Sequence, residues 1–204
     1  ADRAYDLIEP TLRARGPMAV GSQATFQMAI REQAAALGQR LTLKGMARLA
    51  PQDHERFLRH AITLHRSVDA ATCKALIDGK LPAARTQQIE LDHSASRSDA
   101  EFEQSLLMSR RAMQAELADS PAMPKLSTAQ AEAAEKAWGR SILARGRAPA
   151  DKVRFERVRA DAAKASNEDT CWLTLLYLEA MLDLRGSERV WQLQSYMLDT
   201  ASDQ

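Results

Sequence analysis

One stretch of this sequence occurs twice, and this repetition constrains the fold more than any other feature. Residues 50–73, APQDHERFLRHAITLHRSVDAATC, return without a gap 98 residues later, in residues 148–171, as APADKVRFERVRADAAKASNEDTC. Eight of the 24 aligned positions are identical, whereas ordinary composition gives roughly one or two by chance. The identical pairs are Ala50/Ala148, Pro51/Pro149, Asp53/Asp151, Arg56/Arg154, Phe57/Phe155, Arg59/Arg157, Thr72/Thr170 and Cys73/Cys171. We therefore predict an internal tandem duplication.

The repeated residues are those that begin a helix. Proline is favoured at the first helical position because an N–H there would have no partner within the helix. The aspartate two residues later lies in the first turn, where exposed N–H groups and the helix dipole favour a carboxylate. Phe57 and Phe155 then open an apolar stripe in each copy. We predict that each is buried in the core of its own copy.

Four arginines recur beside these phenylalanines, namely Arg56, Arg59, Arg154 and Arg157. We expect their aliphatic stems to pack on the helix surface and their guanidinium groups to pair with carboxylates or helix-terminal carbonyls. The two repeated helices should end near Ser67 and Ser166. Each serine is placed to cap the following helix, which carries the cysteine.

Composition predicts an all-α protein. Aromatic residues make up 5% of the chain, glycine and proline number 8 and 7, and no segment shows the alternation typical of a strand. The prolines after Ser120 mark a break between the two copies. We predict two tandem, diverged helical-bundle subdomains, residues 1–120 and 121–204.

Local signals place several helix ends. A short helix is expected within residues 1–14, and serine caps predict longer helices that start at Ser22 and Ser127. Gly45 is expected to stop the helix that starts at Ser22. Residues 81–98 should form a helix followed by a loop.

The longest apolar run, residues 172–178, is stopped by Glu179 and is far shorter than the ~18 to 20 residues of a membrane span. The chain begins at Ala1 without methionine, which suits a mature exported protein after removal of its signal peptide, or a trimmed chain. We expect a periplasmic protein, with a cytoplasmic location as the alternative.

The two cysteines, Cys73 and Cys171, occupy equivalent positions of the repeat, so a disulfide between them would join the two copies. Such a bridge fits an exported protein whose copies face each other. The alternative is one buried free cysteine in each copy. A catalytic thiol would need a histidine partner in an electropositive setting, and a duplication gives no reason to expect two.

No pattern of residues indicates an enzyme or a cofactor site. His54, His60 and His65 are six and five residues apart, so they do not share one helix face as metal ligands four apart would. His93 is expected in a polar loop. The sequence contains no glycine-rich phosphate loop, no G-x-S-x-G and no H-E-x-x-H. We therefore predict a non-enzymatic protein without metal or cofactor.

The densest basic stretch is residues 140–159, with seven Lys or Arg against Asp151 and Glu156. Pairs within the helix, Asp151 with Arg154 and Lys152 with Glu156, favour a solvated face. Nucleic-acid binding is the alternative, although no array of aromatic residues accompanies the basic ones and the net charge is +1.

The chain resembles, in type, the periplasmic immunity proteins that Gram-negative bacteria keep against antibacterial effectors of type VI or type IV secretion systems. The features that carry the resemblance are the length of 204 residues, the helical composition, the two diverged copies and the lack of a catalytic motif. The resemblance implies a protein that binds a cognate toxin and occludes its active site.

The resemblance assigns no partner-binding residues. We expect the partner first at the divergent segments 81–98 and 120–125, because binding residues are concentrated in variable connections. The alternative function is a non-enzymatic helical scaffold or adaptor, with nucleic-acid binding through residues 140–159.

Overall fold

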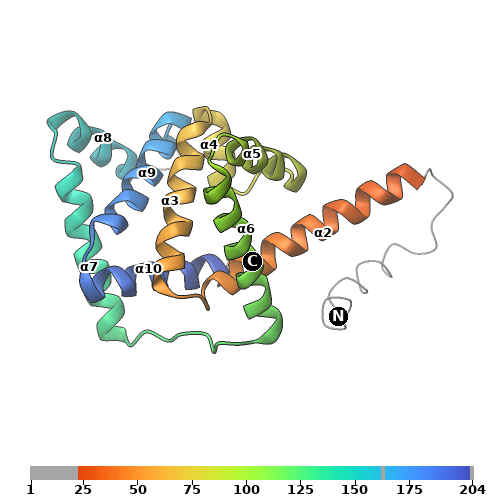
Figure 1. Ribbon diagram of the computed structural model, residues 1–204. Coiled ribbons are helices and arrows are strands. Elements are labelled where there is room, and N and C mark those ends of the chain that lie inside the picture. Colours follow the sequence, from red (N-terminus) through yellow and green to blue (C-terminus); the bar gives the residue numbers. More distant parts are fainter. Residues whose placement is uncertain (1–22, 162–163, 203–204) are drawn as a thin grey trace.

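The computed structural model describes residues 23–161 and 164–202 (Figure 1). Within these residues the chain forms nine α-helices and no strand, which confirms the predicted all-α class. The helices are α2 (Gln23–Met46), α3 (Pro51–Ser67), α4 (Ala70–Ile77), α5 (Ala83–Ala95), α6 (Asp99–Ala118), α7 (Thr128–Arg145), α8 (Pro149–Ala160), α9 (Asn167–Asp183) and α10 (Gly186–Ser202). None of these helices is both long and apolar enough to cross a bilayer.

The helices pack into one body, from which the N-terminal part of α2 projects (Figure 1). The rest of α2 packs along α6, and α3 lies near the middle of the body, where it contacts α9. α10 runs along the base and contacts α7, α3 and α2. α10 therefore contacts helices on both sides of the predicted boundary at residue 120.

Three clusters of buried apolar side chains hold this body together. The α2–α6–α10 cluster comprises Met46, Ala47, Met108, Ala112, Met197 and Ala201. The α3–α9–α10 cluster comprises Leu58, Ile62, Leu178, Met181 and Leu193. The α7–α9 cluster comprises Ile142, Leu176 and Ala180. The first two clusters combine residues from both sides of the predicted boundary, so the division into subdomains 1–120 and 121–204 stays a prediction.

Phe57 and Phe155, which we predicted to be almost fully buried, are each partly exposed. Phe57 packs against the edge of the α2–α6–α10 cluster, while its neighbour Leu58 is 0% exposed in the α3–α9–α10 cluster. Phe155 packs against the α7–α9 cluster from α8, a helix that contacts chiefly α9 and has few other neighbours. The prediction of almost full burial is therefore corrected for both phenylalanines.

α2 continues through Gly45 and ends at Met46, one residue beyond the predicted stop. Gly45 is buried, and a Cβ atom added to it would lie 1.8 Å from the backbone oxygen of Ala112 in α6. Glycine is required here because the two helix backbones touch, and only a residue without a side chain leaves room for this contact.

Several predicted helix starts are confirmed. α3 and α8 begin at Pro51 and Pro149. Ser127 caps α7 in a capping box, and Ser166 caps α9 by accepting a hydrogen bond of 3.1 Å from the backbone N–H of Asp169. These starts were predictable because each depends on residues within one helical turn.

Other predicted ends differ or lie outside the described residues. α3 ends at Ser67 as expected, but Asp69 caps α4, because its carboxylate accepts two backbone N–H groups of the first turn. α8 ends at Ala160, earlier than predicted. The start at Ser22 and the helix within residues 1–14 lie outside the described residues.

Candidate binding groove

The two cysteines form a disulfide that joins α4 to α9. Cys73 and Cys171 are both buried, with an S–S distance of 2.03 Å and a Cα–Cα distance of 5.8 Å. The sequence left two alternatives open, a disulfide or two free buried cysteines. The structure contains the disulfide, which joins equivalent positions of the repeat. The disulfide fixes the contact between α4 and α9, which also pack against each other.

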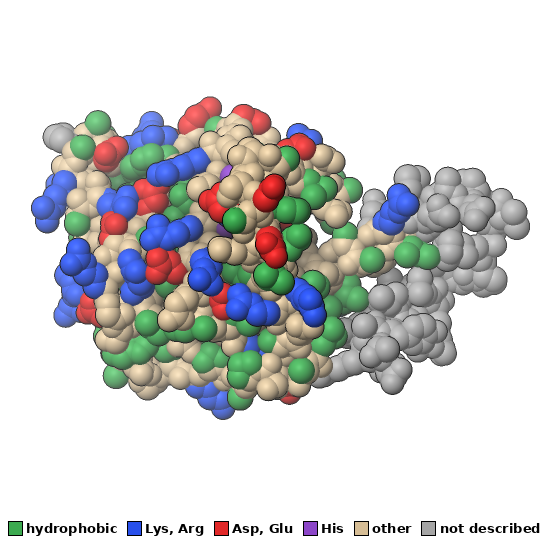
Figure 2. All heavy atoms as spheres, in the orientation of Figure 1, with side chains coloured by type: hydrophobic (Ala, Val, Ile, Leu, Met, Phe, Trp, Pro, Cys, Tyr) green, Lys and Arg blue, Asp and Glu red, His purple; other side chains and the backbone are tan. Residues whose placement is uncertain are grey.

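A groove with a volume of about 740 Å³ lies between α3, α6 and α9, with contributions from α5 and α7. We call it the arginine groove. Its basic lining comprises Arg56, Arg59, Arg66, Arg97 and Arg145, its acidic lining comprises Glu101, Glu179 and Asp183, and His60 and His93 also line it. Figure 2 shows basic and acidic side chains interspersed over this face, with histidine partly visible between them.

The repeated arginines of α3 pair with carboxylates of their own helix, as predicted. Arg56 bonds Asp53 at 3.2 Å and Arg59 bonds Glu55 at 2.7 Å. Both side chains are more than half exposed, at 57% and 59%. Exposed pairs of this kind contribute little to stability, so both guanidinium groups are available to a binding partner.

The repeated arginines of α8 also pair with a carboxylate, which confirms the prediction in the second copy. Arg154 and Arg157 both bond Asp169, at 2.6 Å and 2.9 Å, and Arg154 lies 4.6 Å from the ring centre of Trp172. The hydrogen bond from Arg154 is the main cause that lowers the pKa of Asp169. Arg154 thus bonds α9 and not Asp151, with which we predicted a pair.

Three further basic residues of the stretch 140–159 are paired as well. The pairs are Arg140 with Glu188, Arg145 with Asp183, and Lys152 with Glu156. The pairing of Lys152 with Glu156 was predicted, whereas the carboxylates of Glu188 and Asp183 come from other helices. This neutralisation favours the solvated face over a strip that binds nucleic-acid phosphates.

Two histidines that are distant in the sequence meet in the groove. His60 of α3 and His93 of α5 have ring centres 5.3 Å apart. His93, which we predicted in a polar loop, lies in a helix and is 9% exposed, with Nε2 3.1 Å from Oγ1 of Thr63. Burial, together with the nearby Arg97 and His93, lowers the pKa of His60 to about 4, so its ring is neutral at pH 7.

The other two histidines do not line the groove. His54 is buried, and its Nε2 donates to the backbone oxygen of Met46 at 2.8 Å. Burial lowers the pKa of both His54 and His65. Within residues 23–161 and 164–202, no group of three or more His, Cys, Asp or Glu side chains is arranged to hold a metal ion.

Sequence reasoning missed the groove because its members come from five helices. A local signal exists only for the start of α6, where Ser98 and Glu101 form a capping box. Nothing in the sequence places Arg97, which lies between α5 and α6, beside His60 of α3. Of the expected contact segments, 81–98 contributes His93 and Arg97 to the groove, and 120–125 contributes none of its lining.

Comparison of the chain with protein-family models, with curated proteins and with solved structures gives no match.

Proposed function

We propose that this chain is a binding protein that receives part of a partner protein in the arginine groove. The observation that carries the proposal is the groove itself, a hollow of about 740 Å³ with five arginines in its lining. Arginine is enriched at protein–protein interfaces, and it is common among the few residues that contribute most of their binding energy. The buried clusters and the disulfide hold the groove walls in place, which lowers the ordering cost of binding.

The partner that the sequence resemblance favours is a secreted antibacterial effector, whose active site this chain would occlude as an immunity protein. The disulfide supports a periplasmic location, because disulfides persist in oxidising compartments such as the bacterial periplasm. In this proposal the chain acts without catalysis, and it protects the cell by covering the effector surface.

We also propose that the two copies arose by internal duplication. Three observations support this. α3 and α8 begin at equivalent prolines, α4 and α9 carry the equivalent cysteines, and the disulfide joins those cysteines. In a crystal structure, superposition of the two segments is expected to bring Pro51 onto Pro149 and Cys73 onto Cys171. A superposition that fails to align these pairs would contradict the duplication.

The functional test is co-expression with the product of a neighbouring gene directed to the periplasm. We expect that product to be toxic alone and harmless together with this chain. A matched pair of variants then tests the groove. Gln104→Trp fills the groove from α6, whereas Gln114→Trp places the same side chain at an exposed position of α6 outside the groove lining.

Gln104→Trp is expected to abolish protection and binding, and Gln114→Trp to retain both. If both variants protect equally, the groove is not the contact surface. If no neighbouring product is toxic or bound, the immunity proposal is wrong and the scaffold or adaptor alternative takes its place.

A further inference from the structure

Arg97 lies in the short link between α5 and α6, and its side chain lines the arginine groove. The link is fixed at both ends. The backbone N–H of Ser96 bonds the backbone oxygen of His93 at 3.2 Å, and Ser98 forms the capping box with Glu101 that begins α6. Two helix ends therefore set the position from which the Arg97 side chain extends.

One nitrogen of the Arg97 guanidinium is fully used within the protein. Nη1 lies 2.9 Å from Nδ1 of His60 and donates to Oγ of Ser105, also at 2.9 Å. Ser105 is free to accept, because its own hydroxyl hydrogen goes to the backbone oxygen of Glu101 at 3.0 Å. The neutral ring of His60 accepts at Nδ1 and so carries its hydrogen on Nε2.

The opposite edge of Arg97, formed by Nε–H and Nη2–H₂, has no hydrogen-bond acceptor among residues 23–161 and 164–202. Both partners of Nη1 are neutral, and no carboxylate of the described residues bonds the guanidinium group of Arg97. By contrast, each of the other arginines that line the groove contacts a carboxylate. These are Arg56, Arg59, Arg66 and Arg145.

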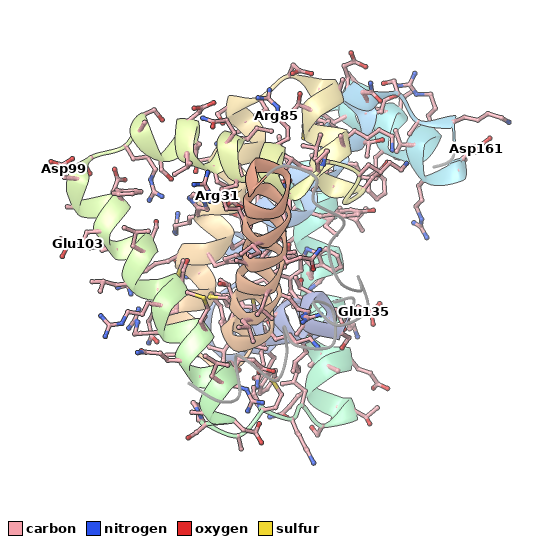
Figure 3. The ribbon with its side chains drawn as sticks, turned by 90° about the vertical axis from the view of Figure 1, so that its right-hand side faces the viewer. Arg31, Arg85, Asp99, Glu103, Glu135 and Asp161 are labelled. Carbon is pink, nitrogen blue, oxygen red and sulfur yellow. A yellow bond between two sulfur atoms is a disulfide. The ribbon has the colours of Figure 1, made fainter. Side chains whose placement is uncertain are left out.

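The acidic residues near the start of α6 make no hydrogen bond to Arg97, although its charge, after the hydrogen bonds from Ser98, also helps to lower the pKa of Glu101. The carboxylate of Glu101 accepts from the backbone N–H and the hydroxyl of Ser98, at 3.1 Å and 2.8 Å. Asp99 and Glu103 point away from the body of the protein (Figure 3). What remains is a guanidinium that two hydrogen bonds hold in place, with its Nε–Nη2 edge free. This edge matches a carboxylate or phosphate group, which it can hold by two parallel hydrogen bonds.

We infer that the free edge of Arg97 is a binding site for one oxyanion, a carboxylate or phosphate group, that enters through the arginine groove. His60, which also lines the groove, offers its Nε2–H as a neutral donor, and Arg59 adds positive charge. The identity of the molecule that carries the oxyanion rests on the proposed function, because a partner protein bound in the groove would present the group to Arg97.

The test uses the full chain in about 150 mM chloride, near physiological ionic strength, with two probes in separate titrations. The probes are inorganic phosphate and a hexaglutamate peptide with blocked ends, and the tighter probe identifies the source of the oxyanion. We expect one equivalent to bind, and Arg97→Gln to weaken binding about tenfold or more. Arg97→Lys should also bind more weakly, because an ammonium group lacks the two-pronged edge.

The matched control is Arg147→Gln, at an exposed arginine outside the groove lining, which is expected to leave both affinities within about twofold. A second readout is the His60 ring, followed by NMR. Its pKa should rise from about 4 when the probe binds, because the oxyanion offsets the charge of Arg97. Urea unfolding of each variant shows that it remains folded.

Equal binding by the unaltered chain and Arg97→Gln, equal losses in Arg97→Gln and Arg147→Gln, or no saturable binding of either probe would each overturn the inference. Neither probe requires the partner. Loss of probe binding with intact protection therefore counts against the oxyanion site alone, and intact probe binding without protection counts against the proposed function alone.

Discussion

Gly45 is a single residue on which the packing of two helices depends, because its backbone touches that of Ala112 in α6. We expect Gly45→Ala to lower the free energy of unfolding by about 1 to 3 kcal/mol, since backbone atoms must move to admit the methyl group. The control is Gly38→Ala in the same helix, where an added Cβ meets nothing within 4 Å. That change should raise stability by about 0.5 to 1 kcal/mol. Urea unfolding distinguishes the two, and equal effects would argue against a backbone contact at Gly45.

His60 makes the stability of the protein depend on pH. Its pKa is about 4 in the folded protein, chiefly because of burial, and about 6.5 in the unfolded chain. Between these values the unfolded chain binds more protons than the folded protein. The contribution of His60 to the free energy of unfolding is therefore fully present above about pH 6.5, and it is lost as the pH is lowered from about 6.5 to about 4.

We expect His60→Gln to make this decline shallower. The measurement is the free energy of unfolding in urea at pH 7 and pH 4.5, for the unaltered chain and for the variant. Part of the decline should persist in the variant, because burial also lowers the pKa of His54 and His65. The same pH dependence in both proteins would show that His60 does not titrate as described.

At the scale of helices, the disulfide is the covalent link between α4 and α9 and closes a separation of 98 residues. We expect no reactive thiol in the denatured protein without reductant, and two after reduction, by thiol counting. Reduction should lower the free energy of unfolding by at most about 4 to 5 kcal/mol, the value that the chain-entropy model gives for such a loop. Two reactive thiols before reduction would favour the alternative of free buried cysteines.

The all-α class and several helix starts were predictable from the sequence, whereas much of the packing between helices was not. Pro51, Ser127 and Ser166 act through hydrogen bonds and dihedral preferences within one turn, so the sequence near each helix start is enough. Gly45 and His93 were misread because what surrounds them comes from other helices. The arginine groove was missed for the same reason.

In the molecule as a whole, the two predicted subdomains share their largest buried clusters. The α2–α6–α10 and α3–α9–α10 clusters both need α10, which follows the predicted boundary, together with helices that precede it. We therefore expect one cooperative unfolding transition, with the same midpoint by circular dichroism and by tryptophan fluorescence. Two separate transitions would show that the copies unfold independently.

The position of α10 has a consequence for the order in which the protein is made. α10 is the last described helix to be synthesised, yet it completes clusters that contain Met46 and Leu58. At ordinary translation rates, roughly 7 to 28 s separate the synthesis of Met46 from that of Gly186. Throughout this interval the apolar faces of α2, α3 and α6 lack a partner that they have in the finished fold. Until α10 is available, these faces stay exposed, so the unfinished chain is prone to aggregate through them.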